Sequence, residues 1–193
     1  METSVRKVLT VLFLALPLLA SKPRVEITTT AGAFTVELEP DATPVTVANF
    51  MNYVKKGFYP GTIFHRVMKS APTIIQGGGL TPDLAKKPTD ASIKCEADLA
   101  KAKGLSNVRG TIAMARESLP DSAKAQFYIN VGNNKALDFK ARNLADFGYC
   151  VFGKVIKGMN VVDKIAAAKT STQKTMADVP VKPVTITAVK EVQ

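Results

Sequence analysis

The stretch that decides the fold begins at residue 57, where residues 57–67 read GFYPGTIFHRV, and it ends with QGGG at residues 76–79. Residues 62–68 are mostly apolar, and a turn rich in Gly and Pro precedes them, which is typical of a β-strand. Residues 74–76 predict a second short strand, and the glycines that follow allow tight backbone turns beside a site. The stretch therefore predicts two strands that carry a cation, Arg66, and an amide, Gln76.

Further short strands lie on both sides of this stretch. Clusters of Gly, Pro, Asn and Asp separate them, and no internal repeat or low-complexity linker divides the chain. Many short strands with only two helices are typical of an antiparallel barrel or sandwich. The predicted strands are residues 25–30, 33–39, 62–68, 74–76, 111–116, 126–131, 150–156 and 184–190.

Two helices are predicted among these strands. Thr43 suits the N-cap of the first and Pro44 its first helical position, where a missing N–H costs nothing. Apolar residues then recur at helical spacing up to Val54, and Gly57 ends the helix. The second helix is expected near residues 160–168, and the polar residues 169–179 are expected to form a loop.

The first 20 residues have the composition of a signal peptide. Arg6 and Lys7 precede residues 8–20, VLTVLFLALPLLA, which carry no charge. This apolar run is shorter than the about 20 residues that a spanning helix needs. We therefore expect cleavage between Ala20 and Ser21, a periplasmic or secreted domain of residues 21–193, and no stable membrane insertion. An uncleaved signal anchor is the alternative.

The composition is that of a globular protein, with 46% hydrophobic and 22% charged residues. The net charge of +10 raises the question of a nucleic acid or another anionic polymer as partner. However, the Lys and Arg residues are scattered, and no aromatic residues interleave with a basic stripe. A solvated basic surface is the favoured interpretation, and no nucleic-acid partner is expected.

Several kinds of chemistry are disfavoured by the residues present. The only histidine, His65, lies in an apolar strand without a nucleophile motif, which favours a structural, hydrogen-bonded role. One His and two separated cysteines, Cys95 and Cys150, make a poor metal set. The two cysteines form either a disulfide or, as we favour, two buried free thiols. Residues 77–79 lack the Gly-Lys-Ser/Thr of a phosphate loop. No metal or cofactor is expected.

Taken together and in order, several segments resemble the cyclophilin-type peptidyl-prolyl cis-trans isomerase family, in the style of its bacterial, exported members. They are GFY (57–59), GTIFHRV (61–67), QGGG (76–79), RGTIAMAR (109–116), DSA (121–123), QFYIN (126–130), FGYCVFGKV (147–155) and GM (158–159).

The resemblance implies a mainly β fold, a closed eight-stranded antiparallel β-barrel capped by two α-helices. It implies an enzyme that binds proline-containing peptides and folding chains in an outer groove and turns their X–Pro bonds, without a covalent intermediate or a metal. The alternative is a chaperone-like module that binds such chains with little catalysis.

The resemblance also implies roles for single residues. Arg66 is the catalytic donor, whose guanidinium favours the twisted state in which the prolyl nitrogen accepts a hydrogen bond better. The substrate-binding positions are Gln76, Ile74, Ala115, Arg116, Gln126, Tyr128, Leu137 and Tyr149.

Three departures from the family pattern concern the proline pocket. Residues 68–75, MKSAPTII, stand where the family has a shorter stretch with Pro-Gly-Phe-Met, so Thr73 and Ile74 replace Phe and Met. Ala136 stands where the family has an aromatic residue, and Tyr128 where it has Phe. Lost aromatic contact predicts weak substrate affinity and weak or no binding of cyclosporin. The alternative is that Met68 or Pro72 fills the space.

Overall fold

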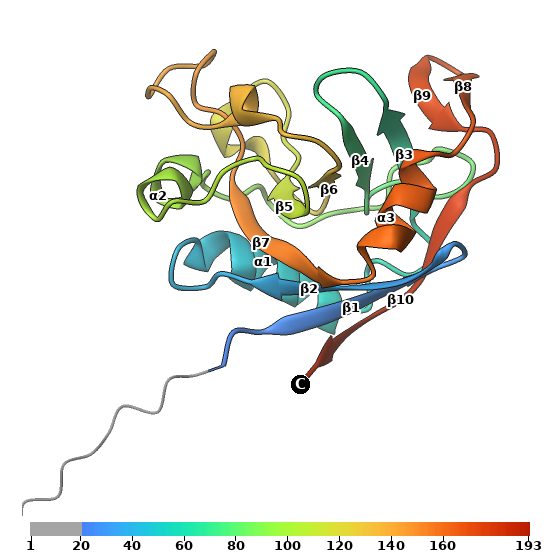
Figure 1. Cartoon of the computed structure of the whole chain (residues 1–193), viewed down its shortest axis with the longest axis horizontal. Helices are drawn as coiled ribbons and strands as arrows, with labels where there is room; N and C mark the ends of the chain where they lie inside the picture. Colours follow the sequence, from blue (N-terminus) through green and yellow to red (C-terminus); the bar gives the residue numbers. More distant parts are fainter. Residues whose placement is uncertain (1–20) are drawn as a thin grey trace, which may run out of the picture.

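The computed structural model describes residues 21–193, so the predicted signal peptide lies outside the described residues. Eight strands close into an antiparallel barrel in the order β1-β10-β3-β4-β6-β5-β7-β2 (Figure 1). Each predicted strand is present in it. Their bounds are β1 Arg24–Thr29, β2 Gly32–Leu38, β3 Ile63–Met68, β4 Ile74–Gly77, β5 Thr111–Met114, β6 Phe127–Asn130, β7 Val151–Lys157 and β10 Val184–Val192.

The prediction of a loop at residues 169–179 is wrong, because a second small sheet forms there. β8 (Thr170–Gln173) pairs with β9 (Met176–Pro180), and Lys174 turns the chain between them with a φ of 52°. The hairpin is largely polar, and only Val179 and Pro180 in it are buried, so the sequence carries no alternating apolar pattern. β9 lies against β3, which places this hairpin next to the strand that carries Arg66 (Figure 1).

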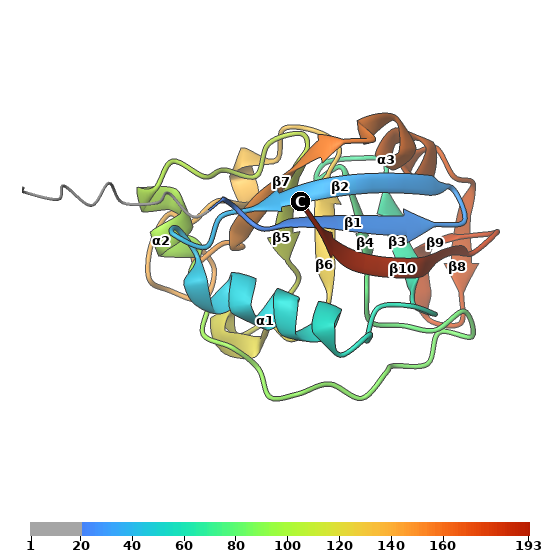
Figure 2. The same cartoon turned by 90° about the horizontal axis from the view of Figure 1, so that it is seen from below.

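The two predicted helices lie on opposite sides of the barrel (Figure 2). α1 (Pro44–Lys55) buries Val47, Phe50 and Val54 in the barrel core, and α3 (Met159–Ala166) buries Val162 and Ile165 in the same core. A third helix, α2 (Ala97–Ala102), was not predicted, because it has too few turns for an apolar period to show in the sequence. Two short 3₁₀ turns, Pro120–Ser122 and Lys135–Leu137, complete the helical segments.

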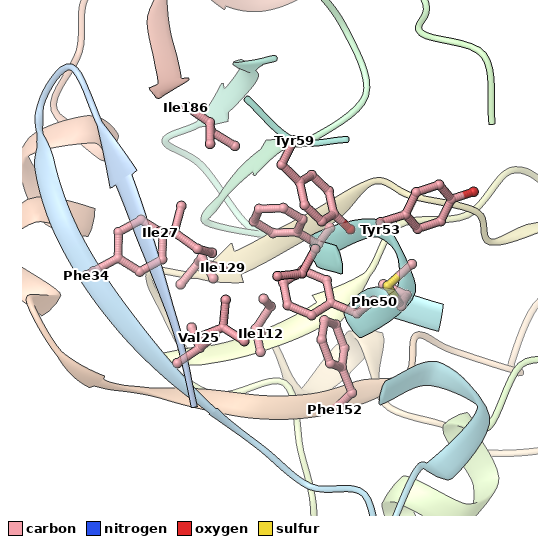
Figure 3. Packing of buried hydrophobic residues seen from close by; sticks show 14 of the residues in the cluster. Val25, Ile27, Phe34, Phe50, Tyr53, Tyr59, Ile112, Ile129, Phe152 and Ile186 are labelled. Atoms are coloured by element: carbon pink, nitrogen blue, oxygen red, sulfur yellow. The ribbon is translucent and has the colours of Figure 1, made fainter. Parts of the chain in front are cut away.

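The core combines branched aliphatic residues from the strands with a group of aromatic rings (Figure 3). Phe50 from α1 lies at the centre of the rings. Its centroid is 5.3 Å from those of Tyr59 and Phe152 and 5.7 Å from that of Phe127. Each of these rings is almost fully buried. Because Phe127 belongs to β6, this packing holds the inner face of the strand whose other side chains reach the groove described below.

The amino terminus of α1 is capped by a residue far away in the sequence. Thr43 precedes the helix as expected, but its hydroxyl donates to the Glu39 carbonyl and makes no cap. The buried carboxylate of Glu96 accepts hydrogen bonds from the Val45 and Thr46 amides and from the Thr46 hydroxyl, at 2.8–3.1 Å. A carboxylate at this end of the helix also interacts favourably with the positive end of the helix dipole.

Replacing Glu96 with Ala is expected to lower the free energy of unfolding by about 2 kcal/mol, because three donors lose their acceptor in a mostly buried place. Glu96→Gln is the matched control, since its amide oxygen keeps part of the acceptor set. Urea unfolding of the three proteins measures the effect. Equal midpoints for Glu96→Ala and the unchanged protein would show that the cap contributes nothing.

Candidate active site

The strands β3, β4 and β6 bring three predicted site residues into one row on the outside of the barrel. The register pairs Arg66 with Gln76, and Gln76 with Tyr128. Directly opposite residues in such pairs have Cβ atoms about 5 Å apart. Arg66 is exposed, and none of the ion pairs found within residues 21–193 involves it. Its guanidinium is therefore free to act on a ligand in front of this row.

The amide side chains of Gln76 and Gln126 are joined by a hydrogen bond. Gln76 Nε2 donates to Gln126 Oε1 over 3.0 Å. A Cβ at Gly79 would overlap the Gln126 side chain, so a larger residue there would displace Gln126. The two glutamines line a surface cavity of about 150 Å³ together with Ala115 and Arg116. Four of the predicted binding residues thus share one cavity wall.

Arg116 joins two loops beside this cavity. Its Nε donates to the Gly148 carbonyl over 3.0 Å, and Nη1 donates to the carbonyls of Glu117 and Ser118. The guanidinium carbon lies 4.6 Å from the centre of the Tyr149 ring, a cation–π contact. Arg116 therefore holds Tyr149 in place, and its guanidinium is already engaged by the protein.

The remaining predicted residues form an apolar cluster next to the row. Ile74 and Tyr128 are buried in it, and Leu137, Tyr149 and Ala115 pack against it. Met68 also packs against this cluster, whereas Thr73 lies against Gly132 and donates its amide N–H to Asn134 Oδ1. Thus Met68, and not Thr73, stands with Ile74 at the pocket that the resemblance assigns to proline.

A buried polar network that the sequence did not reveal fixes the ring of Tyr128. The Tyr128 hydroxyl donates to Asn107 Oδ1 over 2.7 Å, and Asn107 donates through its main-chain and side-chain nitrogens to Asp138. Burial raises the pKa of Tyr128 well above its usual value, so the hydroxyl stays protonated and a donor. The extra oxygen of Tyr128, compared with the Phe of the family, is thereby satisfied inside the protein.

A wider hollow of about 520 Å³ opens on the other side of Leu137 and Tyr149. Ala136 is part of its wall, at the position where the family pattern has an aromatic residue. The small side chain leaves this edge of the proline cluster open. The exposed Leu144 lies in the same hollow, on a loop between Leu137 and Tyr149.

His65 is buried, as its apolar strand predicts, but the expectation of a hydrogen-bonded histidine is wrong for one atom. Its Nδ1 has no hydrogen-bond partner within residues 21–193. Burial lowers the pKa of His65 to about 4. The positive charge of Arg66 also lowers this pKa, whereas the main chain of Ile63 raises it. The ring is therefore neutral at pH 7. A register shift in the β3–β4 pair between Phe64 and Arg66 places His65 at an irregularity of the ladder.

Cys95 and Cys150 are both buried free thiols, the alternative that the sequence favoured. Burial raises the pKa of Cys150 to about 12, and the Thr46 hydroxyl is 3.4 Å from its sulfur. A thiol with so high a pKa is a poor nucleophile at neutral pH. Residues 21–193 contain no group of three His, Cys, Asp or Glu side chains arranged to hold a metal ion. No helix within these residues is long and apolar enough to cross a bilayer.

Two lysines that line the groove were not predicted from the sequence. Lys86 and Lys87 belong to the long segment between β4 and α2 and lie in the wall of the cavity that holds Gln76 and Gln126. Lys87 Nζ donates to the Phe58 carbonyl and lies 4.7 Å from the centre of the Phe58 ring. No local pattern could indicate either lysine, because only the folded path of this segment brings it to the groove.

Comparison with known proteins places this barrel and groove in a class. A crystal structure of a cyclophilin-type peptidyl-prolyl cis-trans isomerase from Cryptosporidium parvum, obtained in the presence of the dipeptide Ala-Pro, superposes with a TM-score of 0.70 and 25% identity over 86% of this chain and 96% of that one. The described structure thus has the architecture of that class.

The sequence comparisons are more specific. The family profile described as "Cyclophilin type peptidyl-prolyl cis-trans isomerase/CLD" matches residues 24–191. Peptidyl-prolyl cis-trans isomerase A of Dickeya dadantii is 48% identical over 164 residues, which cover 85% of this chain and 82% of the relative. A peptidyl-prolyl cis-trans isomerase of Acinetobacter baylyi is 49% identical over 166 residues, covering 86% and 84%. The chain belongs to the cyclophilin-type peptidyl-prolyl cis-trans isomerase family.

Proposed function

We propose that the protein accelerates the rotation of X–Pro bonds in exported polypeptides, with Arg66 as the group that stabilises the twisted bond. One observation carries the assignment of Arg66. Its guanidinium is exposed, takes part in no ion pair within residues 21–193, and lies opposite Gln76 beside the apolar cluster of Ile74 and Tyr128.

The chemistry needs only a well-placed donor. An X–Pro bond turns over in tens to hundreds of seconds unaided, because resonance holds it planar. When the bond twists, resonance is lost and the prolyl nitrogen becomes a better acceptor. A donor that reaches this nitrogen binds the twisted state more tightly than either planar state, and this difference lowers the barrier.

The other site residues hold the chain around the bond. The proline ring packs into the cluster of Ile74, Tyr128 and Leu137, where Met68 replaces the contact area of an absent aromatic side chain. The amides of Gln76 and Gln126, and the main chain at Ala115 and Arg116, bind the substrate main chain. The presence of an Ala-Pro dipeptide with the similar Cryptosporidium protein supports this class of ligand.

A direct experiment combines a peptide assay with a refolding assay. The protein is expected to accelerate cis-to-trans conversion of a short Ala-Pro peptide and also the slow refolding phase of a protein limited by proline isomerisation. A chaperone-like binding module would change the yield of refolding while leaving the rate of the peptide reaction unaltered. That result would overturn the proposed function.

The proposed site of action is outside the cytoplasm, on the basis of the charged start and apolar run of residues 1–20. Expression of the full chain in a bacterium, followed by fractionation and N-terminal sequencing, tests this. We expect a periplasmic or secreted product that begins at Ser21. A product that keeps residues 1–20 in the membrane fraction would instead indicate a signal anchor.

The open edge at Ala136 predicts weak or absent cyclosporin binding, and Ala136→Trp is expected to tighten it by about tenfold or more. The new ring would cover the hollow next to Leu137 and Tyr149 and bury part of the inhibitor surface. Titration calorimetry of both proteins measures the change. Leu144→Trp, which places the same side chain elsewhere in the hollow, is the control, and equal affinities for both variants would contradict this role of residue 136.

A further inference from the structure

A further cavity, which we call the hairpin pocket, lies between the barrel and the β8–β9 hairpin. It has a volume of about 350 Å³, and its walls include His65, Leu80, Leu84 and Met176, with Arg66 and Lys86. β9, which carries Met176, lies against β3 in both overall views (Figures 1 and 2). This size falls in the range of pockets that hold small ligands or side chains.

The hairpin pocket is continuous with the peptide groove. Gln76 and Gln126 line both the hairpin pocket and the cavity that contains Ala115 and Arg116. Ile74 of the proline cluster and Gln76 are two residues apart on β4, which is about 7 Å. An extended peptide advances about 3.3 Å per residue. A substrate with its proline at Ile74 therefore reaches the hairpin pocket within two or three residues.

The walls of the hairpin pocket carry three kinds of groups that together suit one type of side chain. Leu80, Leu84 and the flexible thioether of Met176 offer apolar contact, and sulfur packs well against aromatic rings. The cations of Arg66 and Lys86 suit the face of an aromatic ring. The third kind is His65, which is only 2% exposed and whose Nδ1 lies beneath the pocket surface without a hydrogen-bond partner among residues 21–193.

Buried polar atoms without partners are rare in native proteins and call for an explanation. In a neutral imidazole one ring nitrogen is a hydrogen-bond donor and the other is an acceptor. The tautomer determines whether Nδ1 is the donor or the acceptor. A phenolic hydroxyl both donates and accepts, so it can pair with Nδ1 in either tautomer. A tyrosine presents an apolar ring with such a hydroxyl at its tip.

We infer that the hairpin pocket is a second subsite of the peptide groove, which takes an aromatic side chain, tyrosine best, located within three residues of the proline. The ring packs against Leu84 and Met176, and its hydroxyl pairs with His65 Nδ1. This inference rests on the proposed function, because it extends the same groove, and it names the class of substrate sequence that binds most tightly.

The test measures binding directly and turnover separately. Fluorescently labelled peptides of one length carry a central Pro and have Tyr, Phe or Ala at each of the three positions on either side. Fluorescence anisotropy gives the dissociation constants. We expect one or two neighbouring positions at which Phe binds about tenfold more tightly than Ala, and Tyr about threefold more tightly than Phe.

Three variants separate the contributions of the walls. Met176→Ala is expected to reduce the advantage of Phe over Ala to about twofold. His65→Leu, which removes the nitrogen and keeps an apolar wall, is expected to abolish the preference for Tyr over Phe while the advantage of Phe over Ala remains. Leu144→Ala alters an exposed apolar residue in the separate hollow beside Ala136 and is expected to change neither ratio.

Affinities that do not distinguish Tyr, Phe and Ala at any of the six positions would overturn the inference, as would an aromatic preference that Met176→Ala leaves intact. The rate of isomerisation of the all-Ala peptide, measured on the same protein, reports on the proposed function. Turnover of that peptide without an aromatic preference would contradict only the inference that the hairpin pocket is a subsite. An aromatic preference without turnover would support the subsite but contradict the proposed isomerase activity.

Discussion

Replacing Arg66 with Ala is expected to lower kcat/KM for an X–Pro peptide by about 100- to 1000-fold, the usual effect of losing one donor to a transition state. The fold should be unaffected, because the side chain is exposed and takes part in none of the ion pairs within residues 21–193. The melting temperature is therefore expected to stay within about 2 °C.

Arg66→Lys is the matched control, since it keeps the charge and loses the planar set of donors. If geometry matters as well as charge, this variant falls between the unchanged protein and Arg66→Ala. A variant Arg66→Ala that keeps a third or more of the activity would contradict the role of Arg66 as the donor. A large fall in melting temperature would mean that Arg66 serves the fold instead.

Lowering the pH from 7.5 to 4 is expected to remove about 3 kcal/mol of unfolding free energy through His65 alone. Burial lowers the pKa of His65 to about 4 in the folded protein, whereas its ordinary value is 6.5. Only from about pH 7.5 upward is the ring essentially neutral in both states, so that it contributes almost no pH dependence there. As the pH falls below 6.5, His65 becomes protonated in the unfolded chain but stays neutral in the folded protein. The free energy of unfolding therefore falls by up to about 1.4 kcal/mol per pH unit.

His65→Leu isolates this effect, because His65 is the only histidine of the chain and Leu cannot titrate. Urea unfolding of both proteins at pH 7.5, 6, 5 and 4 gives the difference. The variant is expected to be at least as stable as the unchanged protein at pH 7.5, since it removes an unpartnered buried nitrogen. Parallel curves for the two proteins across this range would show that His65 titrates normally in the fold.

The barrel was predictable because its strands carry local signals. Residues 62–68 and 74–76 are short apolar runs bounded by Gly and Pro, and they form β3 and β4. The helix at Pro44 was predictable for the same reason, from the proline and the helical spacing of the buried residues up to Val54. Arg66 and Gln76 could be selected only through the resemblance to a family, because a lone arginine in a strand is otherwise an ordinary surface residue.

The features that could not be predicted depend on contacts between distant segments. Glu96 caps α1 across the fold, and nothing near residue 96 indicates this. The β8–β9 hairpin is largely polar, and only Val179 and Pro180 in it are buried, so its strands lack an apolar pattern. Met68 reaches the proline cluster because of the path of residues 69–73, which a count of inserted residues does not give.

The measurement that tests the function most directly is exchange spectroscopy by NMR on an Ala-Pro peptide with a small amount of the protein. Uncatalysed exchange between the cis and trans forms is too slow to give cross-peaks on the time scale of seconds. Cross-peaks are expected with the unchanged protein and absent with Arg66→Ala at the same concentration. Shifted peptide signals without exchange in the presence of the unchanged, folded protein would show binding without catalysis and would contradict an isomerase.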